Sequence, residues 1–426
     1  MMEARRSRVR WQIIGLLFLI SVVTYIDRVN ISVAGKELMP VFGLSAVQLG
    51  AVFSSFVLGY ALFQIPGGWL GDRWGARRVL TLAVLWWSLF TVLTAEADRL
   101  FLSALLGILG SLILIRFLIG VGEAAALPNF NRTVANWLAP SERGLGMGIS
   151  IGGIGLGSAV TPPLVAWLMI QYGWKTSFYV TGCIGMVVAG AWYIFSRDNP
   201  HEHPWVGQRE LAWITRSSGG SQPPPSSHHP MAGLLKIRSV WFLTLSYTML
   251  GYIAYIYLSW FFLYLVNVRH FTVLQGSFWA SGPFIAMALF CPLGGWLSDA
   301  LTQKYGRRKG RAGVGSAGML LTGLLIFAGA MVRDPYTAIV LLSLGAGILY
   351  STVGAYWAST IDLSHRHSGA LSGLMNMGAN LGGTLSPTLT PMIGEAWGWP
   401  VALSVAAAAA FLGSLLWLGV GYDEPV

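Results

Sequence analysis

Charged residues are scarce in this sequence. Only 10% of the 426 residues are Asp, Glu, Lys or Arg, whereas about 25% is usual for a soluble chain. So few charges could not cover a water-exposed surface of this size, which excludes an ordinary soluble protein. Cysteine is also scarce. Cys183 and Cys291 lie in apolar stretches, and we expect them to be buried packing residues without a disulfide.

Residues arranged for catalysis or metal binding are missing as well. The seven histidines lie in loops or near predicted helix ends, so we expect no enzyme, no metal site and no organic cofactor. A membrane sensor or channel without transport is a further alternative, besides a symporter and an anion exchanger. Nothing in the sequence supports it, because the polar stretch between the two sets of apolar segments is too short for a signalling domain.

Long apolar runs dominate the sequence instead. A run of about 20 apolar residues is long enough to cross a bilayer as a helix. Twelve such runs predict an all-α membrane protein: 11–34, 46–70, 78–97, 102–127, 142–169, 175–196, 239–267, 273–298, 312–332, 335–361, 368–393 and 398–421. The polar segment 197–238 contains SSGGSQPPPSSHHP and is typical of a flexible linker. We therefore predict an N-terminal six-helix bundle over 1–196, a cytoplasmic linker over 197–238 and a C-terminal six-helix bundle over 239–426.

The positive charges indicate the orientation. With the N-terminus in the cytoplasm, 20 Lys and Arg fall on the cytoplasmic side and 5 on the opposite side. Positive residues concentrate in cytoplasmic loops of membrane proteins, so we expect both termini in the cytoplasm and the chain in the inner membrane. The bias also accounts for the net charge of +10 without nucleic acid. Lipid is the expected surrounding, and a monomer the expected state.

The two sets of helices repeat each other. Gly67-Gly68-Trp69-Leu70-Gly71-Asp72 matches Gly294-Gly295-Trp296-Leu297-Ser298-Asp299 at an offset of 227 residues. Two parallel repeats are typical of a large transporter class with its substrate site at mid-membrane.

The repeated motif resembles that of the major facilitator superfamily. Its pattern is an acidic residue at the end of helix 2, followed by a short basic loop with glycine. The resemblance implies alternating access and a cytoplasmic charge latch, in which Asp and Arg on neighbouring helices pair in one state. Simple anchoring by positive loops is the alternative. The predicted gating residues are Asp72, Arg73, Arg77, Asp299 and Arg307.

A narrower resemblance covers most of the chain. Tyr25-Ile26-Asp27-Arg28-Val29-Asn30, the stretch from Arg116 to Ala124 and Tyr257-Leu258-Ser259-Trp260-Phe261 are similar to motifs of the anion:cation symporter family. That family includes galactonate, hexuronate and glucarate transporters, sialin and vesicular glutamate transporters.

Four ionisable residues lie inside predicted helices: Asp27, Arg28, Arg116 and Glu123. A charge at mid-bilayer costs several kcal/mol, so such residues usually face partners or a cavity. Arginine forks two hydrogen bonds onto a carboxylate, which makes Arg28 and Arg116 candidate ligands of an anion. A poorly solvated acid can exchange a proton near neutral pH, which makes Asp27 and Glu123 candidate proton carriers. The resemblance implies the same roles; structural ion pairs are the alternative.

Neutral polar and aromatic residues complete the predicted site. The resemblance implies that Tyr25 and Tyr60 lie near the substrate. Asn and aromatic side chains suit hydroxyls and sugar-like faces. The C-terminal candidates are Tyr257, Trp260, Trp357, Asn376 and Asn380, with helix packing as the alternative for each.

The predicted function is proton-coupled symport of a small organic anion, such as galactonate, hexuronate or glucarate. The alternative is anion or organophosphate exchange without protons. One departure concerns the substrate: where galactonate-like members have a glutamine in helix 5, this chain has Gly152-Gly153-Ile154. The loss of that amide suggests a less hydroxylated substrate or another mode of binding.

Overall fold

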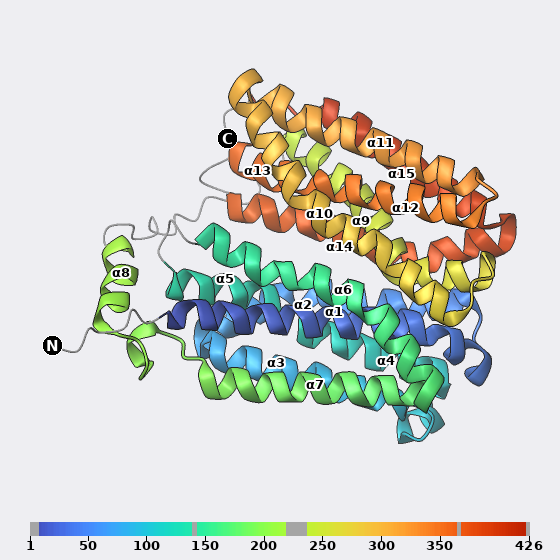
Figure 1. The fold of residues 1–426 in the computed structure, drawn as a ribbon, viewed down its shortest axis with the longest axis horizontal. Coiled ribbons are helices and arrows are strands. Elements are labelled where there is room, and N and C mark those ends of the chain that lie inside the picture. Colours follow the sequence, from blue (N-terminus) through green and yellow to red (C-terminus); the bar gives the residue numbers. More distant parts are fainter. Residues whose placement is uncertain (1–7, 139–142, 219–236, 364–367, 423–426) are drawn as a thin grey trace. The chain divides into compact units, whose positions relative to one another are not determined.

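The computed structural model describes residues 8–138, 143–218, 237–363 and 368–422, and these are almost entirely helical (Figure 1). The α-helices in chain order are α1 (Val9–Phe42), α2 (Ala46–Trp74), α3 (Ala76–Ala95), α4 (Phe101–Glu123), α5 (Ala126–Trp137), α6 (Arg143–Tyr172), α7 (Trp174–Phe195), α8 (Gln208–Ser218), α9 (Arg238–Leu263), α10 (Val273–Tyr305), α11 (Gly313–Met331), α12 (Pro335–Ser351), α13 (Val353–Leu363), α14 (Ser368–Trp397) and α15 (Trp399–Leu418). Short 3-10 or π turns cover Pro200–Glu202, Tyr264–Val268 and Arg308–Ala312.

The predicted membrane helices are present. Within the described residues, 11 helices are long and apolar enough to span a bilayer. The predicted segment 368–393 is α14, which is 30 residues long but carries many Gly, Ser, Thr and Asn residues that lower its hydropathy. The prediction of an all-α membrane fold is therefore confirmed.

Two predicted helices are interrupted. The segment 102–127 ends as α4 at Glu123, and α5 begins at Ala126. Pro128 lies in the first turn of α5, where its missing N–H costs no helical hydrogen bond. The segment 335–361 is likewise divided at Thr352 into α12 and α13. Apolar composition alone cannot show such breaks.

The residues group into two compact units, which we describe separately. The first contains Met1–Arg28, Gly59–Gly157 and Tyr172–His228. The second contains Val29–Leu58, Ser158–Gln171 and His229–Val426. Four of the five boundaries fall inside α1, α2 and α6, and the fifth, between residues 228 and 229, falls within 197–238, where the sequence places the division. The division into two six-helix halves stays a prediction.

In the first unit, α3 packs along α7 and α4 (Figure 1). Helix α2 approaches α4 so closely that a Cβ at Gly59 would overlap the carbonyl oxygen of Phe117. Glycine is therefore required at this crossing, as is common where membrane helices touch. The close approach sets the position of the next residue, Tyr60, relative to α4.

In the second unit, α9 packs against α14, α10 against α12, and α11 against α15. The segment 29–58 also belongs to this unit. It is attached by side-chain hydroxyls: Ser32 Oγ donates to the Ser259 carbonyl at 2.7 Å, and the Ser54 and Thr388 hydroxyls lie 2.9 Å apart.

Part of the predicted linker is folded. Helix α8 lies within 197–238, and in Figure 1 it runs across the beginning of α1. The Glu210 carboxylate of α8 accepts hydrogen bonds from the backbone N–H groups of Val9 and Arg10, at 3.2 and 3.1 Å. The Pro- and Ser-rich stretch of the linker lies outside the described residues.

The expectation that both cysteines are buried is wrong, because Cys183 is exposed on α7 and Cys291 is only half-buried on α10. Its neighbours Ile184 and Val187 are 37% and 71% exposed. This face of α7 is apolar without being covered by protein, as expected where lipid takes the place of a protein partner.

Candidate functional site

A buried ion pair links α1 to α4 in the first unit. The Arg28 Nε donates to the Glu123 Oε2 at 2.7 Å, and the two side chains are 9% and 0% exposed. Removing one partner of a buried pair leaves an uncompensated charge, which costs about 3–5 kcal/mol. The bonded, ionised pair is therefore stable until a proton neutralises Glu123 or another anion binds Arg28.

Two tyrosines pack against the guanidinium of Arg28. Its central carbon lies 4.8 Å from the ring centre of Tyr25 and 4.6 Å from that of Tyr60. Tyr25 precedes Arg28 by three residues on the same helix face, and the Tyr25 hydroxyl accepts from the Arg28 Nη1 at 3.5 Å. The two rings hold the guanidinium in place while its Nε bonds Glu123. Three residues that the sequence placed near the substrate thus lie together with a predicted proton carrier.

Asp27 lies on another side of α1. Adjacent residues of a helix point about 100° apart, so Asp27 and Arg28 leave α1 in different directions, although both interact with Glu123. The Asp27 side chain is 1% exposed, and neither carboxylate oxygen has a hydrogen-bond partner among the described residues. The carboxyl lies near Thr181 of α7; its charge is attracted by Arg116 of α4 and repelled by Glu123.

Arg116 completes the charged cluster. It is 3% exposed and interacts electrostatically with Glu123, Asp27 and Arg28. The four predicted ionisable residues therefore form one cluster, with Glu123 paired directly to Arg28. Two acids and two arginines give no net charge when all four are ionised.

The C-terminal candidates lie in the second unit, and two of them have structural partners. The Tyr257 hydroxyl donates to the Leu342 carbonyl at 2.8 Å, and the Trp260 Nε1 donates to the Pro387 carbonyl at 2.9 Å. Both side chains are buried, at 4% and 1% exposure. These contacts favour the packing interpretation for Tyr257 and Trp260.

Trp357, Asn376 and Asn380 have different surroundings. Trp357 is 42% exposed, and its Nε1 donates to the Tyr247 hydroxyl at 3.2 Å. Asn380 is 5% exposed, and its Nδ2 has no hydrogen-bond partner among the described residues. Asn376 lies one turn earlier on α14. Asn380 is therefore the C-terminal candidate with a polar group left for a ligand, whereas Trp357 offers only its partly exposed ring. Roles for Trp357, Asn376 and Asn380 stay predictions.

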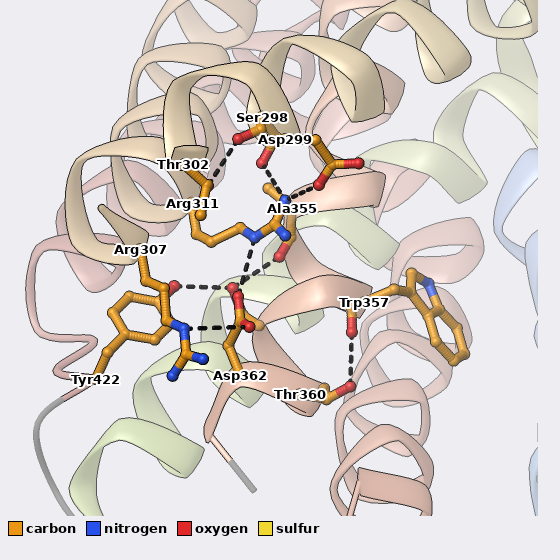
Figure 2. Close-up of polar contacts among 11 residues, drawn as sticks. Ser298, Asp299, Thr302, Arg307, Arg311, Ala355, Trp357, Thr360, Asp362 and Tyr422 are labelled. Atoms are coloured by element: carbon orange, nitrogen blue, oxygen red, sulfur yellow. Dashed lines mark hydrogen bonds and ion pairs between the residues drawn. The ribbon is translucent and has the colours of Figure 1, made fainter. Parts of the chain in front are cut away.

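Figure 2 shows the charged network at one end of the second unit. The Arg311 Nη1 contacts Asp299 at 2.5 Å, and its Nε contacts Asp362 at 3.0 Å. Arg307 reaches the same Asp362 at 3.5 Å. The predicted gating residues Asp299 and Arg307 therefore belong to one network, although they do not pair with each other. Arg311 and Asp362 join them.

The first copy of the gating motif is arranged differently. The Arg77 Nη2 donates to the Tyr193 carbonyl at 2.7 Å, and the Arg77 backbone N–H donates to the Asp198 carboxylate at 2.9 Å. Arg73 lies over the ring of Trp69 at 5.5 Å. The side chain of Asp72 lies outside the described residues, so its pairing stays a prediction.

Sequence reasoning missed three residues of these clusters. Arg311 belongs to a conspicuous basic run and Asp362 to a helix end, but no spacing rule pairs residues 51 positions apart. Thr181 carries no sequence signal, because a threonine in an apolar helix is common. Among the described residues, no group of three His, Cys, Asp or Glu side chains could hold a metal ion.

Comparisons with known proteins agree on the type of protein. The sequence matches the family model of the Major Facilitator Superfamily over residues 17–370 and 278–426. It is 33% identical to the probable sulfoacetate transporter of Cupriavidus necator, covering 88% of this chain and 85% of that protein. It is 31% identical to the hexuronate transporter of Bacillus subtilis, covering 87% and 84%. The crystal structure of a D-xylose–proton symporter has a TM-score of 0.77 at 14% identity, covering 98% of this chain and 99% of that one.

Proposed function

Because this chain belongs to the major facilitator superfamily and is a transporter of organic anions, we propose that it is a proton-coupled symporter of a small sugar acid. Galactonate, hexuronates and glucarate are the first substrates to test. Support comes from the relatives: the named substrates, hexuronate and sulfoacetate, are small anions with an acidic group. These relatives are transporters and not enzymes, and their substrates are of the kind that the anion:cation symporter family carries.

The observation that carries the proposal is the buried pair of Arg28 and Glu123. A proton on Glu123 removes the negative partner of Arg28, and the guanidinium can then receive a substrate carboxylate. With one acid protonated, the four-residue cluster carries one net positive charge, which suits a monoanion. Proton and anion thus each favour binding of the other, and this coupling is reciprocal.

Asp27 is the second proton carrier of the proposal. It lies near Thr181 and Arg116 and not against the two tyrosines. A proton on Asp27 would remove a negative charge near Arg116 and so strengthen the attraction of Arg116 for the substrate anion. Arg116 is the second anion ligand. Trp357 and Asn380 are proposed to contact the substrate body.

Uptake into proteoliposomes tests the coupling. Purified protein should accumulate a labelled hexuronate when the pH gradient is directed inward, and accumulation should collapse with a protonophore. If uptake of every sugar acid and of sulfoacetate is indifferent to the gradient, symport is wrong and exchange without protons takes its place.

The variant Glu123→Gln separates the two mechanisms. It keeps the shape of the side chain but fixes its neutral state, so gradient-driven accumulation should be lost, because an amide cannot bind and release the coupling proton. Counterflow of substrate across the membrane should persist. Glu395→Gln, an exposed acid in the second unit, is the matched control. Equal loss of accumulation and counterflow in Glu123→Gln would instead indicate a structural role.

The proposed location is the inner membrane, with both termini in the cytoplasm. The distribution of Lys and Arg supports this orientation. The proposal includes a monomer as the transporting unit and the proton as the coupling ion.

A further inference from the structure

A pocket lies beside the beginning of α1, away from the charged cluster. Its volume is about 330 Å³, and it is lined by Val9, Gln12, Ile13, Leu16, Phe195, His203 and Trp205. Sites for small molecules usually have about 300–1,000 Å³, so this pocket is at the small end. Most of its lining is apolar.

Residues of the folded linker form one wall of this pocket. His203 is 6% exposed, and its Nε2 lies 2.9 Å from the Phe195 carbonyl. Its ring packs edge-on against Trp137, with centres 5.6 Å apart, and lies 5.3 Å from Trp205. The Trp205 backbone N–H donates to the His203 Nδ1 at 3.2 Å. Both ring nitrogens are thus in use, and the wall is preformed.

The beginning of α1 is not itself the ligand site. The Glu210 carboxylate occupies the N–H groups of Val9 and Arg10 and pairs with the Arg10 side chain at 3.0 Å. An anion would find these donors already satisfied. The pocket therefore offers mainly apolar surface.

Its position is that of a membrane boundary. Val9 begins the first candidate span and Phe195 ends the sixth. Trp205 in the lining and Ile194 next to Phe195 are 57% and 63% exposed, which fits an aromatic residue at the interface and apolar surface facing lipid. The pocket thus opens where the acyl chains of a leaflet meet the head groups.

The charge beside the pocket selects the kind of lipid. Arg8 is exposed directly before Val9, which lines the pocket. Basic segments next to a membrane span attract anionic lipid, each charge contributing about 1 kcal/mol. We propose that the pocket holds one acyl chain of an anionic phospholipid, whose phosphate lies beside Arg8.

Native mass spectrometry of the full chain with added phosphatidylglycerol tests the site. Leu16→Trp fills the pocket, and we expect one fewer tightly retained lipid than in the unchanged protein. Leu19→Trp adds the same ring one turn along, on the exposed face, and should retain the full number. Equal retention in both variants would overturn the site. Size-exclusion profiles and thermal unfolding establish that each variant is folded. Leu16→Gln makes the pocket wall polar without filling the pocket, and it should also reduce lipid retention.

The head group is tested separately. Phosphatidylglycerol should be retained in preference to phosphatidylcholine, and Arg8→Gln should reduce that preference severalfold. Glycerol phosphate without acyl chains should not compete; competition by it would mean an anion site and would overturn the lipid proposal. Equal retention of phosphatidylglycerol and phosphatidylcholine would also overturn the proposal. This site is independent of the proposed transport mechanism, so failure of either leaves the other standing.

Discussion

At the scale of single residues, Arg28 has the most constrained surroundings. Its guanidinium is bonded by Glu123 and covered by Tyr25 and Tyr60. A planar guanidinium stacks on aromatic rings and binds a carboxylate through two parallel bonds, whereas an ammonium is a compact point charge. Position 28 therefore requires the planar guanidinium of arginine and not only a positive charge.

The variant Arg28→Lys should keep the charge but lose the stacking and the forked geometry. Cation–π contacts away from water contribute about 2 kcal/mol or more, and 1.4 kcal/mol is about tenfold in affinity. We expect hexuronate binding to weaken by about tenfold or more in isothermal titration calorimetry. Arg99→Lys is the control, because the Arg99 side chain is 73% exposed. Unchanged affinity in Arg28→Lys would remove Arg28 from the substrate site.

The membership of this cluster could be predicted from the sequence, but its pairing could not. Charges inside apolar helices stand out, and a motif resemblance supplied roles for Asp27, Arg28 and Glu123. Arg116 and Glu123 share a helix face by their spacing, yet the Glu123 carboxylate bonds Arg28, which is 95 residues away. Helix spacing predicts neighbours along one helix. It does not predict how two helices meet.

At the scale of helices, close contact between α3 and α7 depends on missing side chains. A Cβ at Gly185 of α7 would overlap the hydroxyl of Ser88 on α3, while a Cβ at Gly190 would meet nothing within 4 Å. Ser88 is fully buried, so its side chain cannot move aside into solvent.

Gly185→Ala should therefore destabilise the protein by about 1–3 kcal/mol, the usual cost of an overpacked core. Gly190→Ala on the same helix should be nearly neutral. The double variant Gly185→Ala with Ser88→Ala should recover part of the loss, because it removes the overlapping oxygen. Chemical denaturation in detergent measures all three. Equal stability of the two alanine variants would mean that α3 and α7 are less closely packed than described.

Helix α12 begins with a charged cap. The Asp334 carboxylate accepts hydrogen bonds from the Thr337 hydroxyl at 2.6 Å and from its backbone N–H at 2.7 Å. These bonds hold the pKa of Asp334 below its ordinary value of 3.8. The folded state therefore binds this proton less readily than the unfolded state does.

The sign of the pH effect follows. The stabilisation is fully present above the unfolded pKa, and it is lost as the pH falls through the lower folded pKa. Thermal unfolding of the natural protein should show this loss below about pH 4, while Asp334→Asn, which keeps a good cap, should lack that component. Asp334→Ala should be less stable than both at neutral pH. If the unfolding temperatures of the natural protein and of Asp334→Asn change in parallel with pH, the Asp334 carboxylate does not contribute the predicted stabilisation.

At the scale of the whole molecule, apolar length predicted the spans because a bilayer imposes that length on every helix. Composition did not predict the folded part of the linker. Residues 197–218 are polar enough to be mistaken for a flexible segment, but they fold because Glu210 caps α1 and His203 fits among Trp137, Trp205 and Phe195. The contact of Glu210 with Val9 joins residues 201 positions apart, and no local sequence pattern predicts it.

The predicted orientation of the molecule rests on the assignment of 20 Lys and Arg residues to the cytoplasmic side and 5 to the opposite side. It predicts that Arg99 and Arg333 lie outside and that Arg209 and Arg308 lie inside; all four are exposed in the structure. Single cysteines at these positions, in a background with Cys183 and Cys291 replaced by alanine, can be labelled with a membrane-impermeant maleimide. In intact spheroplasts the cysteines at 99 and 333 should react, and those at 209 and 308 should react only after lysis. The reverse pattern would invert the topology and place the Asp299–Arg311–Asp362 network on the outer face, where it could not act as a cytoplasmic gate.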